Sequence, residues 1–286
     1  MPQAKVGVIG GTGLYDMEGM TDIEEVDIST PFGKPSDAII TGKLDGVGVA
    51  FLPRHGRGHR LMPTELPSRA NIYALKSLGV EHIIAINSVG SLKADIKRGD
   101  LVIPDQLIDR TRGRVSTFFG DGIVAHIQFA DPLCPALRQV VYQAAGEAGA
   151  SVHPRGTYVV MEGPAFSTRA ESRLHQSWGA DVIGMTALPE AKLAREAEIC
   201  YAVIACSTDY DSWHEDEEPV SVEMIISTLQ RNIELSKKII RLAVGRLPAT
   251  RDCLCASAMR GAIVTDPALI PAAQKQKLGL IIGKYI

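Results

Sequence analysis

The sequence predicts an α/β fold in which a single domain is built around a central mixed, mostly parallel β-sheet flanked by helices. Short β-rich runs alternate with longer helical stretches, an order that places helices against a sheet. Several of these runs are almost continuous valine, isoleucine and alanine, as expected of strands that are buried on both faces. With 286 residues, 45% of them hydrophobic, the chain can bury one large core.

The elements can be placed along the chain from these patterns. The predicted strands span residues 5–9, 47–52, 82–86, 157–161, 181–183 and 199–207. The predicted helices span residues 68–78, 136–147, 169–178, 187–197 and 222–244. The last helix is the most clearly marked, because apolar residues recur on one of its faces. Beyond about residue 248 the pattern changes, and a C-terminal extension with one short helix is expected.

Charge and hydropathy exclude several classes of function. The net charge is -3 and the isoelectric point is about 6.2, so no basic stripe predicts binding to nucleic acid or to an anionic membrane. No apolar run approaches the ~20 residues that a membrane-spanning helix needs. The first residues lack the pattern of a secretory signal, and a cytoplasmic location is therefore expected.

The chain contains five cysteines, namely Cys134, Cys200, Cys206, Cys253 and Cys255. Their spacing gives no zinc pattern, because only one residue separates Cys253 from Cys255 and no histidine lies near them, so no metal is predicted. Buried, unreactive thiols are the favoured interpretation. A redox pair or a structural disulfide is the alternative, and it gains weight in a hyperthermophile.

Three predicted strands end in small, hydroxyl-bearing or cationic residues. The first ends in Gly-Gly-Thr-Gly at residues 10–13, where backbone N–H groups and the Thr12 hydroxyl suit an anion as well as a tight turn. The second runs into the cationic segment 54–60, in which Arg54 offers a planar fork for phosphate, although a lone charge run is more often a solvated loop. The third ends in Asn-Ser-Val-Gly-Ser at residues 87–91. Ligands bind at such strand ends in α/β sheets, so together they favour an oxyanion site.

Carboxylates and an aromatic ring follow other predicted strands. Asp209 and Asp211 come directly after the strand at residues 199–207, where buried carboxylates need partners or proton chemistry. A turn or a helix cap is the alternative, and no spacing there supports a metal site. Phe166 ends the segment Glu-Gly-Pro-Ala-Phe and suits stacking on a flat base as well as it suits a core. Met185, after a further strand, is by itself more typical of a core.

Several long motifs, in register, resemble those of 5′-methylthioadenosine phosphorylases, members of the trimeric purine-nucleoside phosphorylase group. The motifs lie at residues 8–14, 30–36, 54–56, 162–171 and 208–211, and the likeness runs in order from about residue 6 to residue 244. The resemblance implies a nucleoside phosphorylase type of α/β fold. It implies a catalytic domain over residues 1–248 and a C-terminal extension over 249–286, packed on or near the active site.

The resemblance implies a role for each matching residue. The phosphate contacts would come from Thr12, Arg54, His55, Asn87, Ser88 and Thr186. The residues around the nucleoside would be Phe166 against the purine, Met185 at the sugar, Asp209 and Asp211 facing N7 and the 6-amino group, Val222 and Ile225 around the 5′-substituent, and His126 from a neighbouring subunit.

Two positions depart from the pattern of the animal enzymes. Asn87 stands where threonine is expected, which puts its phosphate contact in question. Gly184 stands where asparagine is expected before Met-Thr, which removes one polar contact to the ligand. Neither departure touches the aspartates.

The matched residues imply a mechanism and a substrate. Asp209 would be the general acid that protonates the departing purine, with Asp211 raising its proton affinity. A carboxylate accepts a hydrogen bond from a 6-amino group and repels a 6-carbonyl oxygen, and Ser167 stands where enzymes for 6-oxopurines have glutamate. Val222 is apolar where general nucleoside enzymes tend to have histidine, which favours a methylthio group.

The predicted reaction is therefore the phosphorolysis of S-methyl-5′-thioadenosine to adenine and 5-methylthioribose 1-phosphate in methionine and purine salvage. Inorganic phosphate would be a co-substrate, with no cofactor and no macromolecular partner beyond other copies of the chain. A homotrimer is implied, with a dimer of trimers as the alternative.

Other functions remain open at this point. A purine-nucleoside phosphorylase acting on adenosine or methylthioinosine is the alternative within enzymes. A nucleotide-binding dehydrogenase would need a fuller glycine fingerprint and an acidic residue after the next strand, where Arg54 and His55 stand instead. A nucleoside-binding protein without catalysis would need no general acid.

Overall fold

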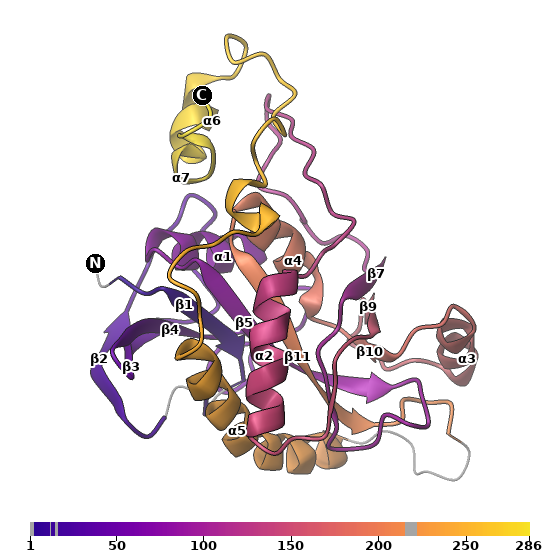
Figure 1. Cartoon of the computed structure of the whole chain (residues 1–286). Coiled ribbons are helices and arrows are strands. Elements are labelled where there is room, and N and C mark those ends of the chain that lie inside the picture. Colours follow the sequence, from indigo (N-terminus) through magenta and orange to yellow (C-terminus); the bar gives the residue numbers. More distant parts are fainter. Residues whose placement is uncertain (1–2, 12, 15–16, 215–221) are drawn as a thin grey trace.

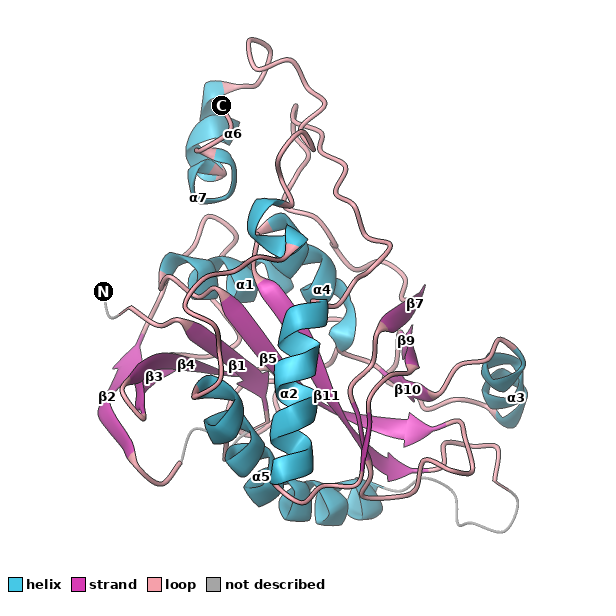
Figure 2. Ribbon diagram, in the orientation of Figure 1, coloured by secondary structure: helices cyan, strands magenta, loops and turns pink. Residues whose placement is uncertain are grey.

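The structure is a computed structural model that describes residues 3–11, 13–14, 17–214 and 222–286, with the side chains of residues 222–231 outside the description. A central sheet is covered on both faces by helices (Figures 1 and 2). Helices α2 (Pro135–Glu147) and α5 (Val222–Val244) pack together against β11 (Cys200–Asp209). Helices α1 (Ser68–Ser77) and α4 (Ala187–Glu196) pack together on the other face.

Eleven strands of the described residues form one sheet. They are β1 (Val6–Gly10), β2 (Met20–Val26), β3 (Ile39–Leu44), β4 (Val47–Pro53), β5 (His82–Ser91), β6 (Leu101–Val102), β7 (Gln106–Arg110), β8 (Val152–His153), β9 (Thr157–Met161), β10 (Val182–Gly184) and β11. Their order is β2-β3-β4-β1-β5-β10-β9-β7, and β11 also pairs with β5, so the sheet branches there. The mixed, mostly parallel sheet predicted from the sequence is confirmed.

The central strands run in one direction. β1 is parallel to β4 and β5, with Ile9 opposite Leu52 and Ala85, and β5 is parallel to β11. Side chains alternate between the two faces of a strand, so neighbouring residues of β1 enter different cores. Val8 packs into the core beneath α2 and α5, and Ile9 packs into the core beneath α1 and α4. The carboxyl ends of these strands consequently meet at one edge of the sheet.

Two strands are longer than the apolar runs that predicted them. β5 continues through its polar residues to Ser91, and β11 continues to Asp209. The added part of β5 is paired on both sides, because Ser91 lies opposite Val182 of the antiparallel strand β10 while Gly90 lies opposite Asp209. Polar side chains that the sequence placed after the strand are therefore held on rigid backbone.

The helix predictions agree with the structure, including α3 (Arg169–Ser177), whose start is fixed by a capping box between Thr168 and Glu171. The C-terminal extension contains three short helices rather than the expected one: η1 (Leu254–Ser257), α6 (Ala272–Lys277) and α7 (Gly279–Ile282). Among the described residues, no helix combines the length and the apolar character needed to cross a membrane.

The extension contacts the body of the molecule near the start of β11. Glu198 accepts a hydrogen bond from the Met259 backbone N–H at 3.1 Å. It also forms an ion pair with Lys284 and accepts a hydrogen bond from the Tyr285 hydroxyl. The extension also pairs with the segment before α2, where Ala125 bridges Ile263. These contacts lie at the end of β11 opposite to Asp209, so the expected placement of the extension near the active site stays a prediction.

Candidate active site

The parallel strands bring the predicted polar residues to one edge of the sheet. The Arg54 backbone N–H donates to the Gly10 carbonyl at 2.9 Å, which joins the ends of β4 and β1. The Arg54 side chain then crosses to β5, where Nη1 donates to the Ile86 carbonyl at 2.8 Å. The ends of β1, β4 and β5 are therefore linked to one another by hydrogen bonds of Arg54.

Arg54 is almost completely buried and is held by a buried glutamate. Nε donates to Oε1 of Glu190 at 2.6 Å and Nη2 donates to Oε2 at 3.1 Å, so the pair is bidentate. Nη2 also donates to Oδ1 of Asn87 at 3.2 Å. Burial disfavours the charge of Arg54, but the Glu190 carboxylate offsets this and holds the pKa above its ordinary value. Four of the five guanidinium N–H groups are thus used within the protein, which leaves one Nη1–H for a ligand.

Asn87 links Arg54 to Thr186. Its Nδ2 donates to Oγ1 of Thr186 at 2.8 Å, while its Oδ1 accepts from Arg54. Thr186 is the residue before α4, and its side chain makes no capping bond to that helix. Its hydroxyl also lies within hydrogen-bonding reach of Tyr158, and rotation of the hydroxyl can direct its hydrogen to a ligand instead. We call Arg54, Asn87, Thr186 and Glu190 the phosphate-side network. Arg54, Asn87 and Thr186, which were predicted to contact phosphate, are therefore joined by hydrogen bonds.

Glu190 was missed by the sequence analysis. It lies on α4, 136 residues from Arg54, and is 1% exposed. Tyr201 of β11 donates its hydroxyl to Oε2 of Glu190 at 2.8 Å. A carboxylate between the apolar residues of a helix was the only available signal, and it does not identify the partner.

His55 follows Arg54 and is locked in one tautomer. Nδ1 lies 2.8 Å from the Leu61 carbonyl oxygen, which can only accept, so Nδ1 carries the proton and Nε2 of the neutral ring is an acceptor. The ring stacks on His59, with centroids 4.2 Å apart. Burial, together with the positive charge of Arg54, lowers the pKa of His55 to about 4.

Asp209 ends β11 as a buried carboxylate. Its Oδ2 accepts from the Thr208 hydroxyl at 2.7 Å and its Oδ1 accepts from the Asp211 backbone N–H at 2.8 Å. Burial raises the pKa of Asp209, and the negative charge of Asp211 adds to this. Gly90 makes the close approach possible, since a Cβ there would lie 2.8 Å from Oδ1.

Asp211 lies next to this group in a strained turn. Its φ is 48°, in the left-handed region that few non-glycine residues adopt. Its Oδ2 is buried and has no hydrogen-bond partner among the described residues. An unpaired buried acceptor is uncommon and indicates a ligand donor or a water at that position. The two aspartates are thus adjacent, as predicted, and one of them presents a free acceptor.

Phe166 does not belong to the core. It is 42% exposed, which removes the core alternative and leaves a ring face open to a flat ligand. Its loop is tied to the aspartate loop, because the Ser212 hydroxyl donates to the Ser167 carbonyl at 2.7 Å. Met185 is half-buried and closely packed against the same loop, since a Cβ on Gly163 would lie 2.5 Å from its Sδ.

Arg114 holds two strand ends together and was also missed. Its guanidinium donates to four backbone carbonyls, those of Met161, Glu162, Met185 and Leu188, at 2.5–3.3 Å. Met161 ends β9 and Glu162 follows it, while Met185 and Leu188 come after β10, so Arg114 fixes the position of Met185 relative to the Glu162 segment. Nothing in the local sequence around residue 114 indicates this role.

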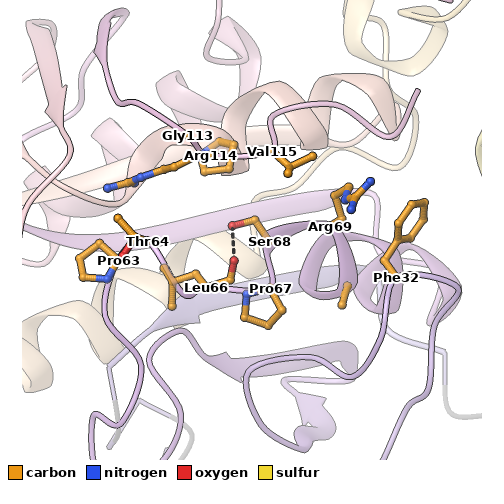
Figure 3. Close-up of a pocket in the computed structure, with 12 residues that line it drawn as sticks. Phe32, Pro63, Thr64, Leu66, Pro67, Ser68, Arg69, Gly113, Arg114 and Val115 are labelled. Atoms are coloured by element: carbon orange, nitrogen blue, oxygen red, sulfur yellow. Dashed lines mark hydrogen bonds between the residues drawn. The ribbon is translucent and has the colours of Figure 1, made fainter. Parts of the chain in front are cut away.

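A pocket of about 190 Å³ lies beside Arg114. Figure 3 shows residues 113–115 facing the segment from Pro63 to Arg69 across it. Its floor includes Pro189, next to Glu190 of the phosphate-side network. Phe166, Met185 and the two aspartates do not line it, and the pocket lies at the start of α1.

Two further predicted residues, Ser88 and His126, make no side-chain contact with this group that the structure describes. Ser88 is half-buried in β5, and its carbonyl lies close to Gly184. His126 is exposed, and its backbone N–H donates to the Ala262 carbonyl of the extension at 2.9 Å. Thr12 lies outside the described residues, as do the side chains of Val222 and Ile225 on α5.

The departure at Gly184 has a structural reason. A Cβ there would lie 2.4 Å from the Tyr158 hydroxyl and 3.1 Å from the Ser88 carbonyl oxygen. Tyr158 is completely buried, and its hydroxyl accepts from Nδ2 of Asn87 at 3.5 Å. The tyrosine hydroxyl therefore occupies the volume that a side chain at position 184 would need, and it connects with the phosphate-side network.

We expect Gly184→Asn to destabilise the protein by about 1–3 kcal/mol, the usual cost of overpacking a core. Adding Tyr158→Phe removes the nearest atom and is expected to restore part of this loss, measured by urea unfolding. Gly146→Asn is the control, because no atom lies within 4 Å of a Cβ there. A Gly184→Asn protein as stable as the parent would show that Tyr158 does not fill this space.

Known proteins resemble this chain over nearly its whole length. A family model described as the Phosphorylase superfamily matches residues 5–244. The S-methyl-5′-thioadenosine phosphorylase of Geobacter sulfurreducens is 61% identical over 282 residues, covering 98% of this chain and 99% of that protein. The protein of the same name from Koribacter versatilis is 56% identical over 283 residues, covering 99% of this chain and 97% of its own.

Solved structures agree in fold. A methylthioadenosine phosphorylase sourced from an antarctic soil metagenomic library superposes with a TM-score of 0.94 at 48% identity, over 98% of this chain and 99% of that one. Methylthioadenosine phosphorylase from Schistosoma mansoni gives 0.81 at 37% identity, over 91% and 96%. The chain therefore belongs to the Phosphorylase superfamily and groups with its S-methyl-5′-thioadenosine phosphorylases.

Proposed function

We propose that the protein catalyses the phosphorolysis of S-methyl-5′-thioadenosine to adenine and 5-methylthioribose 1-phosphate, a step of methionine and purine salvage. The observation that carries the proposal is the buried Asp209 with its raised pKa, placed at the same strand ends as the phosphate-side network. The names of relatives that cover nearly the whole chain support the choice of substrate.

The phosphate-side network supplies donors for an anion beneath the sugar. The free Nη1–H of Arg54 and the Thr186 hydroxyl are its available donors, with Ser88 and Thr12 as further predicted contacts. Glu190 neutralises the Arg54 charge, so the site binds phosphate through directed hydrogen bonds rather than through bare charge. Holding phosphate against the anomeric carbon turns a two-body encounter into a near-attack arrangement, worth up to roughly 7–11 kcal/mol of the barrier.

Asp209 protonates the leaving base in this proposal. Glycoside cleavage passes through a cation-like sugar, and the departing purine must gain a proton. A carboxyl group that is buried and close to Asp211 holds its proton more tightly than in water, so Asp209 can donate at N7 as the bond breaks. The free Oδ2 of Asp211 is then the acceptor for the 6-amino group, and Phe166 stacks on the purine.

The substrate assignment has a direct test. With phosphate present, the specificity constant is expected to be highest for methylthioadenosine, lower for adenosine and lowest for methylthioinosine. A 6-oxopurine leaves the Asp211 acceptor unpaired, and mismatches of this kind discriminate strongly. Free base is measured by chromatography for each substrate. Preference for adenosine or methylthioinosine would replace the proposed substrate while keeping the reaction.

The lowered pKa of His55 leads to a prediction of how phosphate binding depends on pH. Its neutral Nε2 is an acceptor at neutral pH, since the pKa is lowered to about 4, so it cannot donate to a phosphate dianion. The site must therefore bind monoanionic phosphate or take up one proton with the dianion. Either way, we expect KM for phosphate to rise by up to about tenfold per pH unit above neutrality, as linkage to one proton requires.

His55→Gln supplies the control for this pH dependence, because its amide can donate without taking up a proton. The variant is expected to bind phosphate less tightly at pH 6 and to show a shallower rise of KM, with the second ionisation of phosphate as the remaining source. Identical pH profiles for the parent and His55→Gln would place His55 outside the phosphate site.

The active unit is proposed to be a homotrimer in which His126 enters a neighbouring site. The exposure of His126 and its backbone bond to the extension support this role, because both leave the imidazole free to reach a partner. Sedimentation distinguishes the trimer from a dimer of trimers.

The reaction needs no organic cofactor in this proposal, and the cytoplasmic location stays a prediction.

Subunit complementation tests the shared site. Asp209→Asn and His126→Ala proteins should each be poorly active alone. When they are refolded together, about a quarter of the sites should combine Asp209 of one subunit with His126 of the next, as a cyclic trimer requires. No regain of activity on mixing, with mixed trimers confirmed by mass spectrometry, would contradict a shared site.

A further inference from the structure

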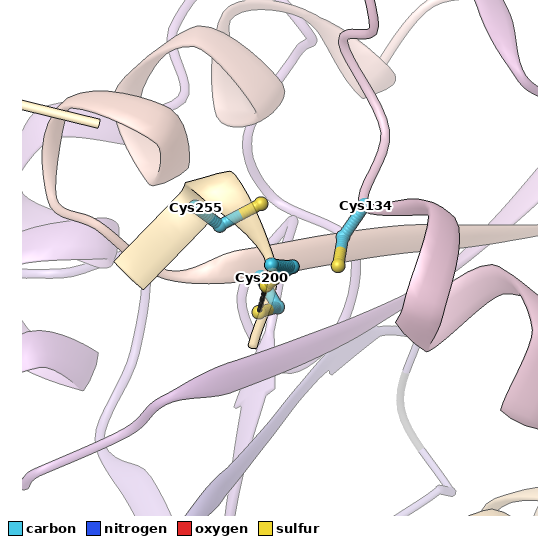
Figure 4. Close-up of side chains that lie close together, drawn as sticks. Cys134, Cys200 and Cys255 are labelled. Carbon is cyan, nitrogen blue, oxygen red and sulfur yellow. Dashed lines mark hydrogen bonds between the residues drawn. The ribbon is translucent and has the colours of Figure 1, made fainter. Parts of the chain in front are cut away.

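Four of the five cysteines meet at one point, which the sequence did not predict. Cys134 precedes α2, Cys200 begins β11, and Cys253 and Cys255 belong to the segment around η1. Their Sγ atoms all lie within 4.8 Å of one another, and Cys200 and Cys253 are 3.3 Å apart. Figure 4 shows Cys134 and Cys255 on either side of Cys200. Cys206 lies further along β11 and is separate from this group.

The spacing fits a single ion held by sulfur. In a tetrahedral zinc site, Zn–S bonds of about 2.3 Å place the sulfur atoms about 3.8 Å apart. The four Sγ atoms need shifts of only about an ångström at most to reach this arrangement, and such shifts are available from side-chain rotation. Three of the cysteines are buried and Cys253 is half-exposed, so the group is screened from solvent but accessible at one side.

The surroundings favour a negatively charged centre. Four thiolates around one divalent cation carry a net charge of about -2, which needs compensation in a buried place. Cys134 stands at the N-terminus of α2, where the helix dipole favours negative charge. Arg246 and Arg251 line a cavity of about 250 Å³ whose wall includes Cys134, Cys200 and Cys253. The cavity provides both nearby cations and a path of entry.

We propose that these four cysteines form a structural site for a thiophilic divalent cation, with zinc as the ion. All four ligands come from the protein, which is typical of a structural centre and leaves no open position for catalysis. Each thiol loses its proton to solvent on binding, and no oxidation or reduction occurs. The site lies at the end of β11 opposite to Asp209, so it is distinct from the nucleoside site.

The proposed ion would join the C-terminal extension to the body of the molecule. Two ligands come from the extension and two come from the rigid start of α2 and β11. The extension in turn contacts Ala125 and His126, through the Ile263 bridge and the Ala262 carbonyl. The order of this surface is therefore expected to depend on the metal.

Elemental analysis of the full-length protein tests the site. Protein grown with zinc and purified without oxygen or chelator is expected to hold about one zinc per chain. Cys253→Ser removes one ligand and should lose most of the zinc. Cys253 is the half-exposed member of the group, so it can be changed without opening the core. Cys206→Ala is the matched control, and it should retain the metal since Cys206 lies outside the group. Circular dichroism checks that both variants are folded.

A second measurement distinguishes a metal site from unreactive thiols and from disulfides. Replacing zinc by cobalt should give the ligand-field absorption of tetrahedral thiolate coordination, and chelation should increase proteolysis within the extension. Metal-free parent protein with five titratable thiols would overturn the proposal in favour of unreactive thiols. Metal-free protein with fewer thiols would overturn it in favour of disulfides. Retention of one zinc per chain by Cys253→Ser would also contradict the assigned ligands.

Discussion

Replacing Asp209 by asparagine is expected to lower kcat/KM for methylthioadenosine by about 10²–10⁴, the usual contribution of a general acid. The amide cannot give a proton to N7, while the geometry is preserved. The Thr208 hydroxyl, which now donates to Oδ2, can instead accept from the new amide and donate to the Val89 carbonyl, 3.2 Å away. Steady-state kinetics over pH measures the effect.

The same variant is expected to keep its stability at neutral pH. Burial raises the folded-state pKa of Asp209, so the cost of its charge is absent below the unfolded pKa and complete above the folded pKa. Asparagine carries no charge at any pH, so this cost does not arise in the variant. Selectivity should also move toward inosine-type substrates, because N7 and the 6-substituent share one edge of the purine, and an amide facing N7 can donate to a 6-carbonyl oxygen. Unchanged selectivity together with near-parent activity would remove Asp209 from the site.

Replacing Glu190 by glutamine is expected to lower the free energy of unfolding by about 3–5 kcal/mol, the usual cost of leaving one buried charge unpaired. Glu190 and Arg54 are 1% and 3% exposed, so water cannot replace the lost carboxylate. The Arg54 guanidinium should then shift, and Asn87 and Thr186 with it, which raises KM for phosphate more than KM for the nucleoside. Denaturant unfolding and separate KM values test both effects.

Two controls separate the ion pair from its neighbours. Tyr201→Phe removes one hydrogen bond to Glu190 and is expected to cost only about 1.5–3 kcal/mol, as for hydrogen bonds to charged groups. The double variant Arg54→Met and Glu190→Met leaves no charge unpaired, so it should recover stability without recovering phosphorolysis. Full activity in that double variant would show that the phosphate-side network does not bind phosphate.

The sequence predicted the central elements well, because buried parallel strands are marked by unbroken apolar runs. It missed five strands of the described sheet, namely β2, β3, β6, β7 and β8. In β2, five of seven residues are exposed at the sheet edge, so no apolar run marks it. It also ended β5 at Ile86, whereas pairing with β10 and β11 extends the strand through its polar residues. Pairing between distant strands overrides local polarity there.

Prediction of the site was similarly limited by distance along the chain. Arg54, Asn87 and Asp209 could be found because each stands at the end of an apolar run. Glu190 and Arg114 act on residues far away in sequence, so only the fold brings them into contact. The cysteine group has the same origin, since three separate segments supply it and no local spacing shows it.

Product analysis with and without phosphate tests the proposed phosphorolysis most directly. Methylthioadenosine is incubated with the purified protein, and adenine and 5-methylthioribose 1-phosphate are quantified together. We expect adenine to appear only when phosphate is present, with one sugar phosphate formed for each adenine. Adenine released without phosphate, together with free methylthioribose, would show hydrolysis and contradict the proposed role of the phosphate-side network.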